Sequence, residues 1–370
     1  MTQVIDLAQQ LISIPSWVGN DCDEQKVGEF IYAWLRANTQ LTIIKQPVQN
    51  GRFNVIAYDT APTRQLLVGH MDTVTPRAGW ETDPLAPVVQ KGRLYGLGST
   101  DMKGSLAAGM LALSRVQTRG VMFLAYCDEE YDFAGMHTFI AEYQDKLKPQ
   151  QIISLDGSAD QVGIGCRGLI EVNFRLRGKT GHAGRPKLGV NAITSGIGLI
   201  NNLERQLISK YSDPILGSST LNLAYCQGGL DTGTGQYGRQ GNNIADLAEF
   251  VLDIRAAKPD LTAQTVKQLI QSYLPGSKLK LENWAVRHDL GSWLTEPNDL
   301  TKLNVSGQYE PSLGYIDTQM LWRAFDKVSC CTIGAGNLEL AHTANEYVEV
   351  RDLEKTLQNV SSLLKGGYND

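Results

Sequence analysis

The sequence lacks the features of a membrane protein or a nucleic-acid-binding protein. No apolar run approaches the ~20 residues that a membrane-spanning helix needs. The 34 lysines and arginines, set against 39 acidic residues, form no cluster of the kind on which nucleic-acid binding depends. The N-terminal residues do not show the basic and then apolar pattern of a signal peptide. We therefore expect a cytoplasmic protein that has no membrane or nucleic-acid partner.

Signatures of several other protein classes are missing as well. The six cysteines are scattered and form no CxxC pair, which favours a reducing compartment over a disulfide framework. No GxSxG motif of a serine hydrolase occurs. A GxGxxG match at 233–238 precedes a segment that we interpret as a strand, whereas a dinucleotide-binding motif needs a helix there. We expect no nucleotide site in that segment.

The pattern of apolar residues indicates two domains. Apolar residues make up 42% of the 370 positions and charged residues 20%, which is ordinary for a globular protein of this length. Strands and helices alternate in the first and last parts, whereas the middle part has the order βαββαβ of a ferredoxin-like fold. We expect an α/β catalytic domain of residues 1–167 and 284–370, with a central mixed, mostly parallel sheet flanked by helices. An α+β domain of residues 168–283 would be inserted into it.

Histidine is scarce, with five residues, and one of them opens the first chemical motif. His70 lies two residues before Asp72 after an apolar run. In an extended chain both side chains project to the same side, so that the carboxylate can orient a metal-binding imidazole. Asp101 follows two glycines at an expected strand-to-helix corner, where a ligand could sit. A surface turn for the first motif and a helix N-cap for the second are the alternative roles.

Acidic residues follow two further apolar strands. The segment CDEEYD (127–132) holds four acids, which are costly at the end of a buried strand unless their charge is compensated, although a solvated loop is the alternative. Asp156 ends another such strand, and His342 follows a glycine-containing loop. Side chains at the ends of several strands of one α/β sheet converge at one crevice. These nitrogen and oxygen ligands suit Zn²⁺, and also Mn²⁺ or Co²⁺.

With these motifs the chain resembles the zinc-dependent aminoacylase and exopeptidase family that contains acetylornithine deacetylase, succinyl-diaminopimelate desuccinylase and glutamate carboxypeptidase. LYGLGSTDMKG, STLNL and LDIR are most similar to the acetylornithine deacetylase branch. The motifs occur in the family's order over nearly the whole chain: GHMDTV, WETDP, LYGLGSTDMKG, DEE, GKTGHAGRP, GVNAI, LDIR and AHTANEYV.

The resemblance implies two divalent metal ions, most simply Zn²⁺, and a role for each matching residue. His70 and Asp156 would bind one ion, Glu130 and His342 would bind the other, and Asp101 would bridge both. Two cations held in this way can activate a water molecule between them and direct its attack.

The same resemblance implies how the metal ligands are supported. Asp72 would orient His70, and Glu129 would be the general base that takes a proton from the attacking water and hands it to the leaving amine. Family members hold the bridging aspartate before a cis peptide, so we expect a cis bond between Asp101 and Met102.

Three further residues of the middle domain match the family. His182 resembles the histidine that reaches the partner subunit's active site and stabilises the oxyanion, which implies a homodimer formed through an inserted lid and dimerisation domain. Arg255 resembles the arginine that binds the substrate α-carboxylate, and Asn242 resembles an asparagine of the same pocket. A surface histidine and a hairpin-turn asparagine are the alternatives.

The sequence departs from the family pattern at two places that concern the substrate. Asp156 stands in LDGS where the branch usually has Glu-Pro-Thr, and Ile316 stands before Asp317 where relatives commonly have a hydroxyl residue. We expect a deacetylase of N-acyl-L-amino acids, with N-acetyl-L-ornithine in arginine biosynthesis as the leading substrate. A dipeptidase or carboxypeptidase, a desuccinylase-like deacylase and a non-catalytic metal-binding member of the family are the alternatives.

Overall fold

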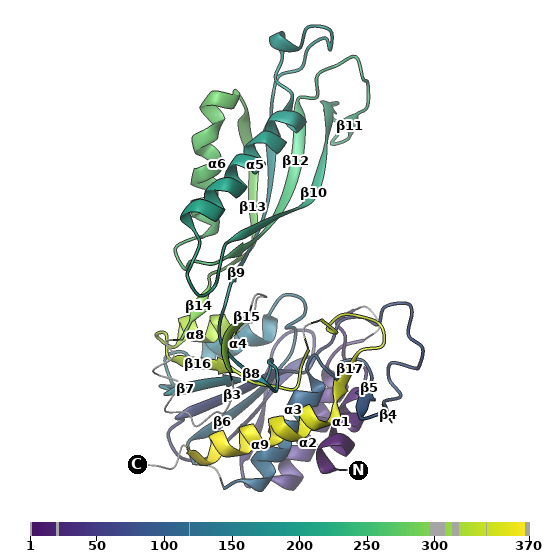
Figure 1. Ribbon diagram of the computed structural model, residues 1–370, viewed down its shortest axis with the longest axis vertical. Helices are drawn as coiled ribbons and strands as arrows, with labels where there is room; N and C mark the ends of the chain where they lie inside the picture. The colour runs from purple at the N-terminus through teal and green to yellow at the C-terminus, as the bar shows by residue number, and fades with distance from the viewer. Residues whose placement is uncertain are drawn as a thin grey trace. The chain divides into compact units, whose positions relative to one another are not determined.

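The structure is a computed structural model and describes residues 2–19, 22–117, 119–295, 308–312, 318–337 and 339–366. The chain divides into two compact units (Figure 1). The first contains Met1–Gly165, Leu294–Glu310 and Ile316–Asp370. The second contains Cys166–Trp293 and Pro311–Tyr315, so that it interrupts the sequence of the first.

The first unit is built on a mixed sheet whose four central strands are parallel. The strand order is β1-β2-β6-β3-β7-β16-β8-β14, with β15 beside β8. Strands β6, β3, β7 and β16 run parallel, whereas β1, β2 and β8 pair antiparallel with their neighbours. The predicted mixed sheet is confirmed, with its parallel part at the centre. The bounds are β1 (Thr42–Pro47), β2 (Phe53–Tyr58), β3 (Gln65–His70), β6 (Val121–Tyr126), β7 (Gln151–Ser154), β8 (Gln161–Cys166), β14 (Trp293–Leu294), β15 (Gln308–Ser312) and β16 (Ser329–Thr332).

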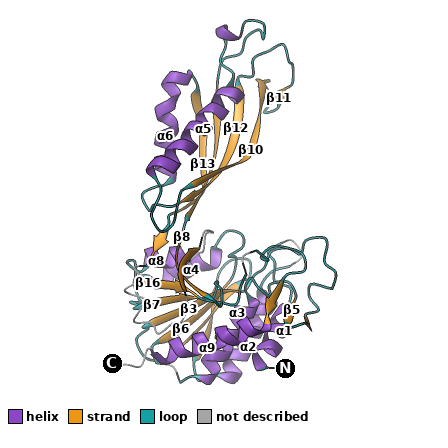
Figure 2. Ribbon diagram, in the orientation of Figure 1, coloured by secondary structure: helices purple, strands orange, loops and turns teal. Residues whose placement is uncertain are grey.

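Helices flank this sheet in two layers (Figure 2). Helices α1, α3 and α9 pack on one another with α2 beside them, and α4 contacts α8. Helix α3 is buried along most of its length because small residues let its neighbours approach, and a Cβ added at Gly109 would lie 2.5 Å from Leu155. The bounds are α1 (Gln3–Ile12), α2 (Gln25–Asn38), α3 (Lys103–Arg115), α4 (Ala134–Tyr143), α8 (Thr318–Ala324) and α9 (Val350–Gly366).

A second, small sheet of the first unit brings together segments that lie far apart in the sequence. Its order is β17-β5-β4, formed by β4 (Val88–Gln90), β5 (Arg93–Tyr95) and β17 (Tyr347–Glu349). Strand β17 pairs antiparallel with β5, with Tyr347 opposite Tyr95. The turn that precedes α3 therefore lies next to the segment that precedes α9.

The second unit has the predicted βαββαβ order. Its antiparallel sheet has the strand order β11-β10-β12-β9-β13, and helices α5 and α6 pack on it around one apolar core. This is the strand order of a ferredoxin-like plan with a short extra strand, β11. The bounds are β9 (Gly168–Arg177), α5 (Ala192–Lys210), β10 (Thr220–Asp231), β11 (Tyr237–Gly238), β12 (Leu247–Ala256), α6 (Ala263–Ser277) and β13 (Lys280–Leu290).

The predicted boundary between residues 283 and 284 falls inside β13, which lies wholly in the second unit. Trp284 packs against the core of that unit and stacks on Phe174, with 5.7 Å between the ring centroids. The entering and leaving segments are neighbours, because Leu169 is paired with Leu290, and the Thr295 N–H donates to the Ile164 carbonyl at 2.7 Å.

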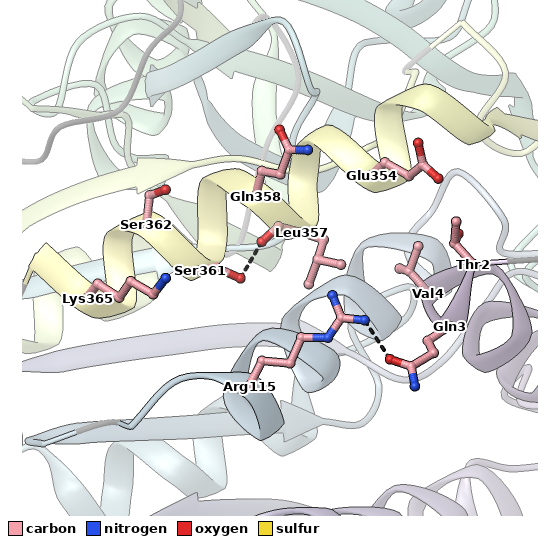
Figure 3. Close-up of a pocket in the computed structure, with 10 residues that line it drawn as sticks. All are labelled: Thr2, Gln3, Val4, Arg115, Glu354, Leu357, Gln358, Ser361, Ser362 and Lys365. Carbon is pink, nitrogen blue, oxygen red and sulfur yellow. Dashed lines mark hydrogen bonds between the residues drawn. The ribbon is translucent and has the colours of Figure 1, made fainter.

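A pocket of about 420 Å³ lies where α1, the end of α3 and α9 meet (Figure 3). In it the Arg115 guanidinium donates to the side-chain oxygen of Gln3 at 2.6 Å. None of the candidate residues predicted from the sequence lines this pocket. None of the helices in the described ranges combines the length and the apolar character of a membrane crossing.

Candidate metal centre

The candidate site lies at the carboxyl ends of three adjacent parallel strands. His70 is the last residue of β3, Asp156 lies two residues beyond β7, and the acidic segment follows β6. Because β6, β3 and β7 are neighbours and run in the same direction, their carboxyl ends meet at one edge of the sheet. The sheet therefore positions side chains that are far apart in the sequence.

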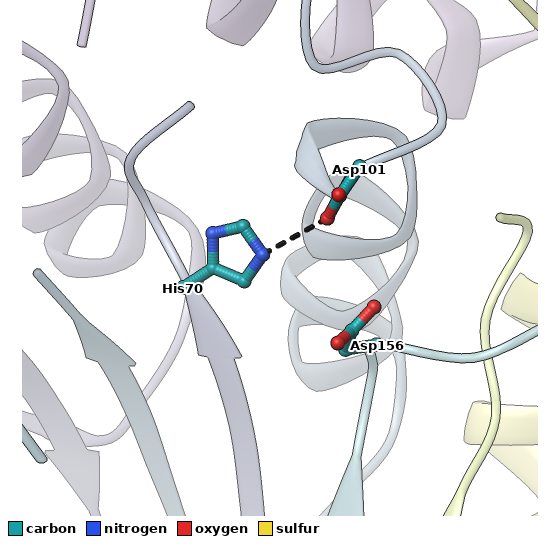
Figure 4. A group of neighbouring side chains, drawn as sticks. All are labelled: His70, Asp101 and Asp156. Carbon is teal, nitrogen blue, oxygen red and sulfur yellow. Dashed lines mark hydrogen bonds and ion pairs between the residues drawn. The ribbon is translucent and has the colours of Figure 1, made fainter. Parts of the chain in front are cut away.

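Two groups of three side chains that could hold a metal ion form at this edge. His70, Asp101 and Asp156 make the first group (Figure 4), and Asp101, Glu130 and His342 make the second. Within each group the candidate ligand atoms all lie within 4.8 Å of one another. The structure thus brings the five predicted ligands together, and Asp101 belongs to both groups.

The two oxygens of Asp101 face different histidines. The His70 Nε2 atom lies 3.1 Å from Asp101 Oδ1, and the His342 Nε2 atom lies 3.3 Å from Asp101 Oδ2. His342 Nε2 is also 2.9 Å from Glu130 Oε2. One carboxylate therefore connects both groups, as the predicted bridging role requires.

Asp101 lies at a tight corner before α3. The peptide bond between Asp101 and Met102 is cis, which confirms the prediction. Gly98 has a φ of +78°, and a Cβ there would lie only 2.7 Å from Thr73. This backbone conformation and the close approach both require glycine at position 98.

Asp72 contacts both His70 and the acidic loop, and its predicted role in orienting His70 stays a prediction. The His70 Nδ1 atom lies 3.1 Å from the backbone carbonyl of Asp72 but 3.5 Å from its carboxylate. The carboxylate also accepts the Glu130 N–H through its other oxygen, Oδ2, at 2.9 Å. Asp72 therefore connects the His70 segment with the acidic loop.

The charges at this site fit cations. Burial raises the pKa of Asp156 to about 7, and the charge of Asp101 adds to that shift. Burial also raises the pKa of Glu129 well above its ordinary value, and the neighbouring charges of Glu130 and Asp156 act in the same direction. A concentration of carboxylates that resist ionisation in this way would be relieved by bound divalent cations.

The same carboxylates favour the protonated, positively charged form of the two histidines. Burial lowers the pKa of His70, but hydrogen bonds to Asp101 and Asp72 raise it well above its ordinary value. Hydrogen bonds to Asp101 and Glu130 raise the pKa of His342 to about 10. The raised pKa values favour protonated imidazoles, and metal binding would release these protons. The donor set therefore fits a metal site.

A buried ionic cluster that the sequence did not predict supports the acidic loop. Asp128 has a φ of +73°, and its carboxylate accepts from Arg52 at 2.8 Å and from the Ala134 N–H at 3.1 Å. Glu24 accepts the Asp128 N–H at 2.9 Å. Glu24, Arg52 and Asp128 are all nearly inaccessible to solvent. The cluster holds both ends of the turn that carries Glu129 and Glu130.

We expect Glu24 to make the stability of the metal-free protein depend on pH. Burial, together with the charge of Asp72, raises the pKa of Glu24 to about 7. Between pH 4.5 and 7 the unfolded chain loses this proton and the folded chain keeps it, so stability falls as pH rises. Glu24→Gln lacks this titration. We therefore compare the free energy of unfolding of the variant with that of the unmodified protein by urea denaturation at pH 5 and at pH 8. The difference, variant minus unmodified, should be about 1–3 kcal/mol more positive at pH 8. An unchanged difference would contradict the expectation.

The predicted substrate-binding residues lie in the second unit. His182 is exposed, and its Nδ1 atom accepts the Gly184 N–H at 3.0 Å. The Ala183 N–H donates to the Asn242 carbonyl at 2.8 Å, so His182 and Asn242 lie on adjoining segments. Arg255 on β12 makes two contacts with Asp253, at 2.9 and 3.1 Å. The roles of these three residues stay predictions.

Two other expectations concern loops. The GxGxxG match at 233–238 lies between β10 and the end of β11, and strand β12 follows it instead of a helix. The arrangement of a dinucleotide-binding motif is therefore not present at that match. The loop that contains Ile316 and Asp317 lies outside the described residues.

Comparisons with known proteins agree with this geometry. The model of the peptidase family M20/M25/M40 matches residues 66–366. An acetylornithine deacetylase from Proteus mirabilis is 28% identical over 98% of this chain and 96% of its own length. One from Vibrio parahaemolyticus is 28% identical over 95% and 93%.

Solved structures show the same fold. The M20 family metallo-carboxypeptidase Sso-CP2 from Sulfolobus solfataricus has a TM-score of 0.76 at 18% identity, with 99% of both chains covered. A tripeptidase from Staphylococcus aureus has a TM-score of 0.75 at 20% identity, with 98% of this chain and 97% of its own covered.

Proposed function

Since the chain belongs to the peptidase family M20/M25/M40 and is a metal-dependent amidohydrolase or exopeptidase, we propose that it deacetylates N-acetyl-L-ornithine with two bound metal ions. One observation carries this proposal: two groups of candidate ligands share Asp101, and one of them includes Glu130, the sequence neighbour of the proposed base Glu129. The identity of the substrate is supported by the names of the relatives and by the motifs of the sequence.

The five ligands would hold the two ions in the groups already described, with Zn²⁺ as the proposed metal and Co²⁺ or Mn²⁺ as substitutes. When bound, the two ions supply Lewis-acid polarisation of the substrate carbonyl and activation of water. Glu129 takes a proton from the attacking water as the water oxygen bonds to the acyl carbon. It delivers that proton to the ornithine nitrogen as the C–N bond breaks, which yields acetate and free ornithine.

The second unit would supply the contacts to the rest of the substrate. We assign to His182 a hydrogen bond to the developing oxyanion in the partner subunit's active site, and to Arg255 a bidentate contact with the α-carboxylate. Asn242 would line the same pocket. The pair that Arg255 forms with Asp253 holds its planar guanidinium in a fixed orientation, so less conformational entropy is lost when a substrate carboxylate binds.

A dipeptidase or carboxypeptidase function is the second candidate. Asp156 favours it, because some peptidases of the family have aspartate at this position, and both solved structures above are named as peptidases. A desuccinylase-like deacylase would use the same residues on a larger acyl group. A family member that binds metal without catalysis is the remaining alternative.

Release of free amine from N-acetyl-L-ornithine by the zinc-loaded protein tests the proposal. Alanyl dipeptides and N-succinyl amino acids serve as competing substrates, and Glu129→Gln serves as the control. Hydrolysis of the acetylated substrate in preference to the others supports the deacetylase. Preference for dipeptides would replace it by the second candidate, and stoichiometric metal without any turnover would indicate the binding protein.

We also propose a homodimer formed through the edge strand β10. Most of this strand is exposed, including Leu223 and Tyr225, and in the described ranges only Leu230 and Asp231 pair on its outer side. Helix α5 contacts β10 and carries two exposed isoleucines of its own, Ile197 and Ile208. An apolar edge strand of this length is a ready template for pairing with a second copy.

Tyr225→Lys should weaken the dimer, because a lysine on an edge strand opposes pairing. We expect the dissociation constant to rise at least about tenfold, which corresponds to ~1.4 kcal/mol. Sedimentation velocity over a concentration series measures it. Val286→Lys, on the opposite edge strand β13, places the same charge at a similarly exposed apolar position and serves as the control. Equal effects of both variants would argue against β10.

The cytoplasm and arginine biosynthesis are the proposed setting. The six cysteines are scattered along the sequence and form no CxxC pair, which fits a reducing compartment. The pathway follows from the proposed substrate alone.

A further inference from the structure

A buried carboxylate outside the two ligand groups contacts the turn that carries Asp101. Glu346 precedes β17 and is only 2% exposed. The pairing of β17 with β5 places it beside the turn at residues 96–101, and its backbone carbonyl accepts the Gly96 N–H at 3.1 Å. The same residue therefore reaches the turn through its backbone and its side chain.

The side chain of Glu346 binds three further N–H groups of this turn. Its Oε2 atom accepts from Gly98 at 2.9 Å. Its Oε1 atom accepts from Thr100 at 2.8 Å and from Asp101 at 3.1 Å. Hydrogen bonds from backbone amides to a carboxylate are roughly twice as strong as bonds between neutral groups. The carboxylate thus fixes the backbone on both sides of the glycine at position 98.

We propose that Glu346 is a positioning residue that sets the direction of the Asp101 carboxylate, and so tunes both metal groups at once. Glu346 holds the backbone nitrogen of Asp101, while His342, four residues earlier, faces its Oδ2 atom. The segment 342–346 therefore contacts both the backbone nitrogen and the side-chain carboxylate of Asp101. The inference rests on the proposed two-metal function, because it concerns the affinity of those groups for metal.

Burying a carboxylate at this position costs free energy that a neutral side chain would not cost. Burial raises the pKa of Glu346 to about 7, although three backbone hydrogen bonds oppose the shift. A neutral glutamine would fill nearly the same volume. It has one acceptor oxygen, and its NH₂ group would face an N–H donor of the turn. The three backbone N–H donors of the turn therefore explain why glutamate suits this position better than glutamine.

Metal titration of Glu346→Gln tests the inference. Metal-free protein is titrated with Co²⁺ alone, and stoichiometry, affinity and the visible spectrum of the bound ions are recorded. We expect both equivalents to bind about 10–100-fold more weakly, the range found for residues that orient metal ligands. At saturating metal, kcat should fall more than KM rises. Binding of both equivalents at the unmodified affinity would overturn the inference.

Glu349→Gln is the matched control. Glu349 lies three residues further along the chain, and its carboxylate accepts at 2.8 Å from Arg93, a residue of β5 outside the turn at residues 96–101. Its variant should bind metal as the unmodified protein does. If the unmodified protein itself bound no metal, the proposed function would fail. If it bound two equivalents but released no amine, only the catalytic part of that function would fail, and the test of Glu346 would stand.

Hydrogen exchange of the unmodified, metal-free protein covers the case in which Glu346→Gln does not fold. The amides of Gly98, Thr100 and Asp101 should be protected to the same degree as those in the middle of α3. Rapid exchange at these three amides, with α3 protected, would show that the carboxylate does not hold the turn and would overturn the inference.

Discussion

Glu129→Gln is expected to lower kcat by about 10²–10⁴-fold while two metal equivalents remain bound. Glutamine matches glutamate in size but cannot accept the proton of the attacking water. The raised pKa of Glu129, which burial causes, places this carboxylate nearer the range in which a general base can both accept and return a proton. Steady-state kinetics and metal analysis on the same preparation measure the two outcomes.

Two other variants of the same loop serve as comparisons for Glu129→Gln. Asp132→Asn changes an exposed acid three residues away and should leave kcat within about twofold, as surface substitutions usually do. Glu130→Ala should instead lose one metal equivalent, because its carboxylate belongs to the second group. If Glu129→Gln kept full activity, or lost metal as Glu130→Ala does, the assignment of the base would be wrong.

Asp101→Ala should remove both metal ions, the largest effect on metal binding of any single substitution in the site. Its two oxygens face the two histidines of different groups, so that one substitution opens both groups. We expect each affinity to fall by more than the ~100-fold that marks the upper range for indirect supports of a metal site. Competition with a chromophoric chelator measures both equivalents, and no turnover should remain.

The single-group variants provide the comparison. Asp156→Ala should weaken one equivalent, and His342→Ala the other, because each residue occurs in one group only. The two losses should be separable in the titration. If Asp101→Ala retained one equivalent at its original affinity, the two groups would not share this residue in solution.

Local patterns predicted the parts of the structure that depend on neighbours in the sequence. The apolar stripe Leu353, Leu357, Val360 and Leu364 forms the buried face of α9. The ends of β3, β6 and β7 meet because parallel neighbouring strands must end at one edge. Naming the five ligands also needed the resemblance to the family, because Asp101 and His342 follow none of these three strands.

Contacts between distant segments could not be predicted in this way. Arg52 and Asp128 lie 76 positions apart in the sequence and Gly98 and Glu346 lie 248 apart, and no local pattern indicates either pair. Glu346 lies within the quoted motif AHTANEYV, which was the only signal at that position.

The second unit is inserted into the first as a self-contained module, because the chain enters and leaves it on adjacent segments. Leu169 is paired with Leu290, and Ile164 is hydrogen-bonded to Thr295. The chain departs and returns on adjacent segments, so that a module of different length or sequence could occupy this point without changing the order of strands in the first sheet. The residues proposed to recognise the substrate belong to this module, and the proposed ligands and base do not. Exchange of the module between relatives is therefore a route by which one catalytic apparatus could acquire new specificities.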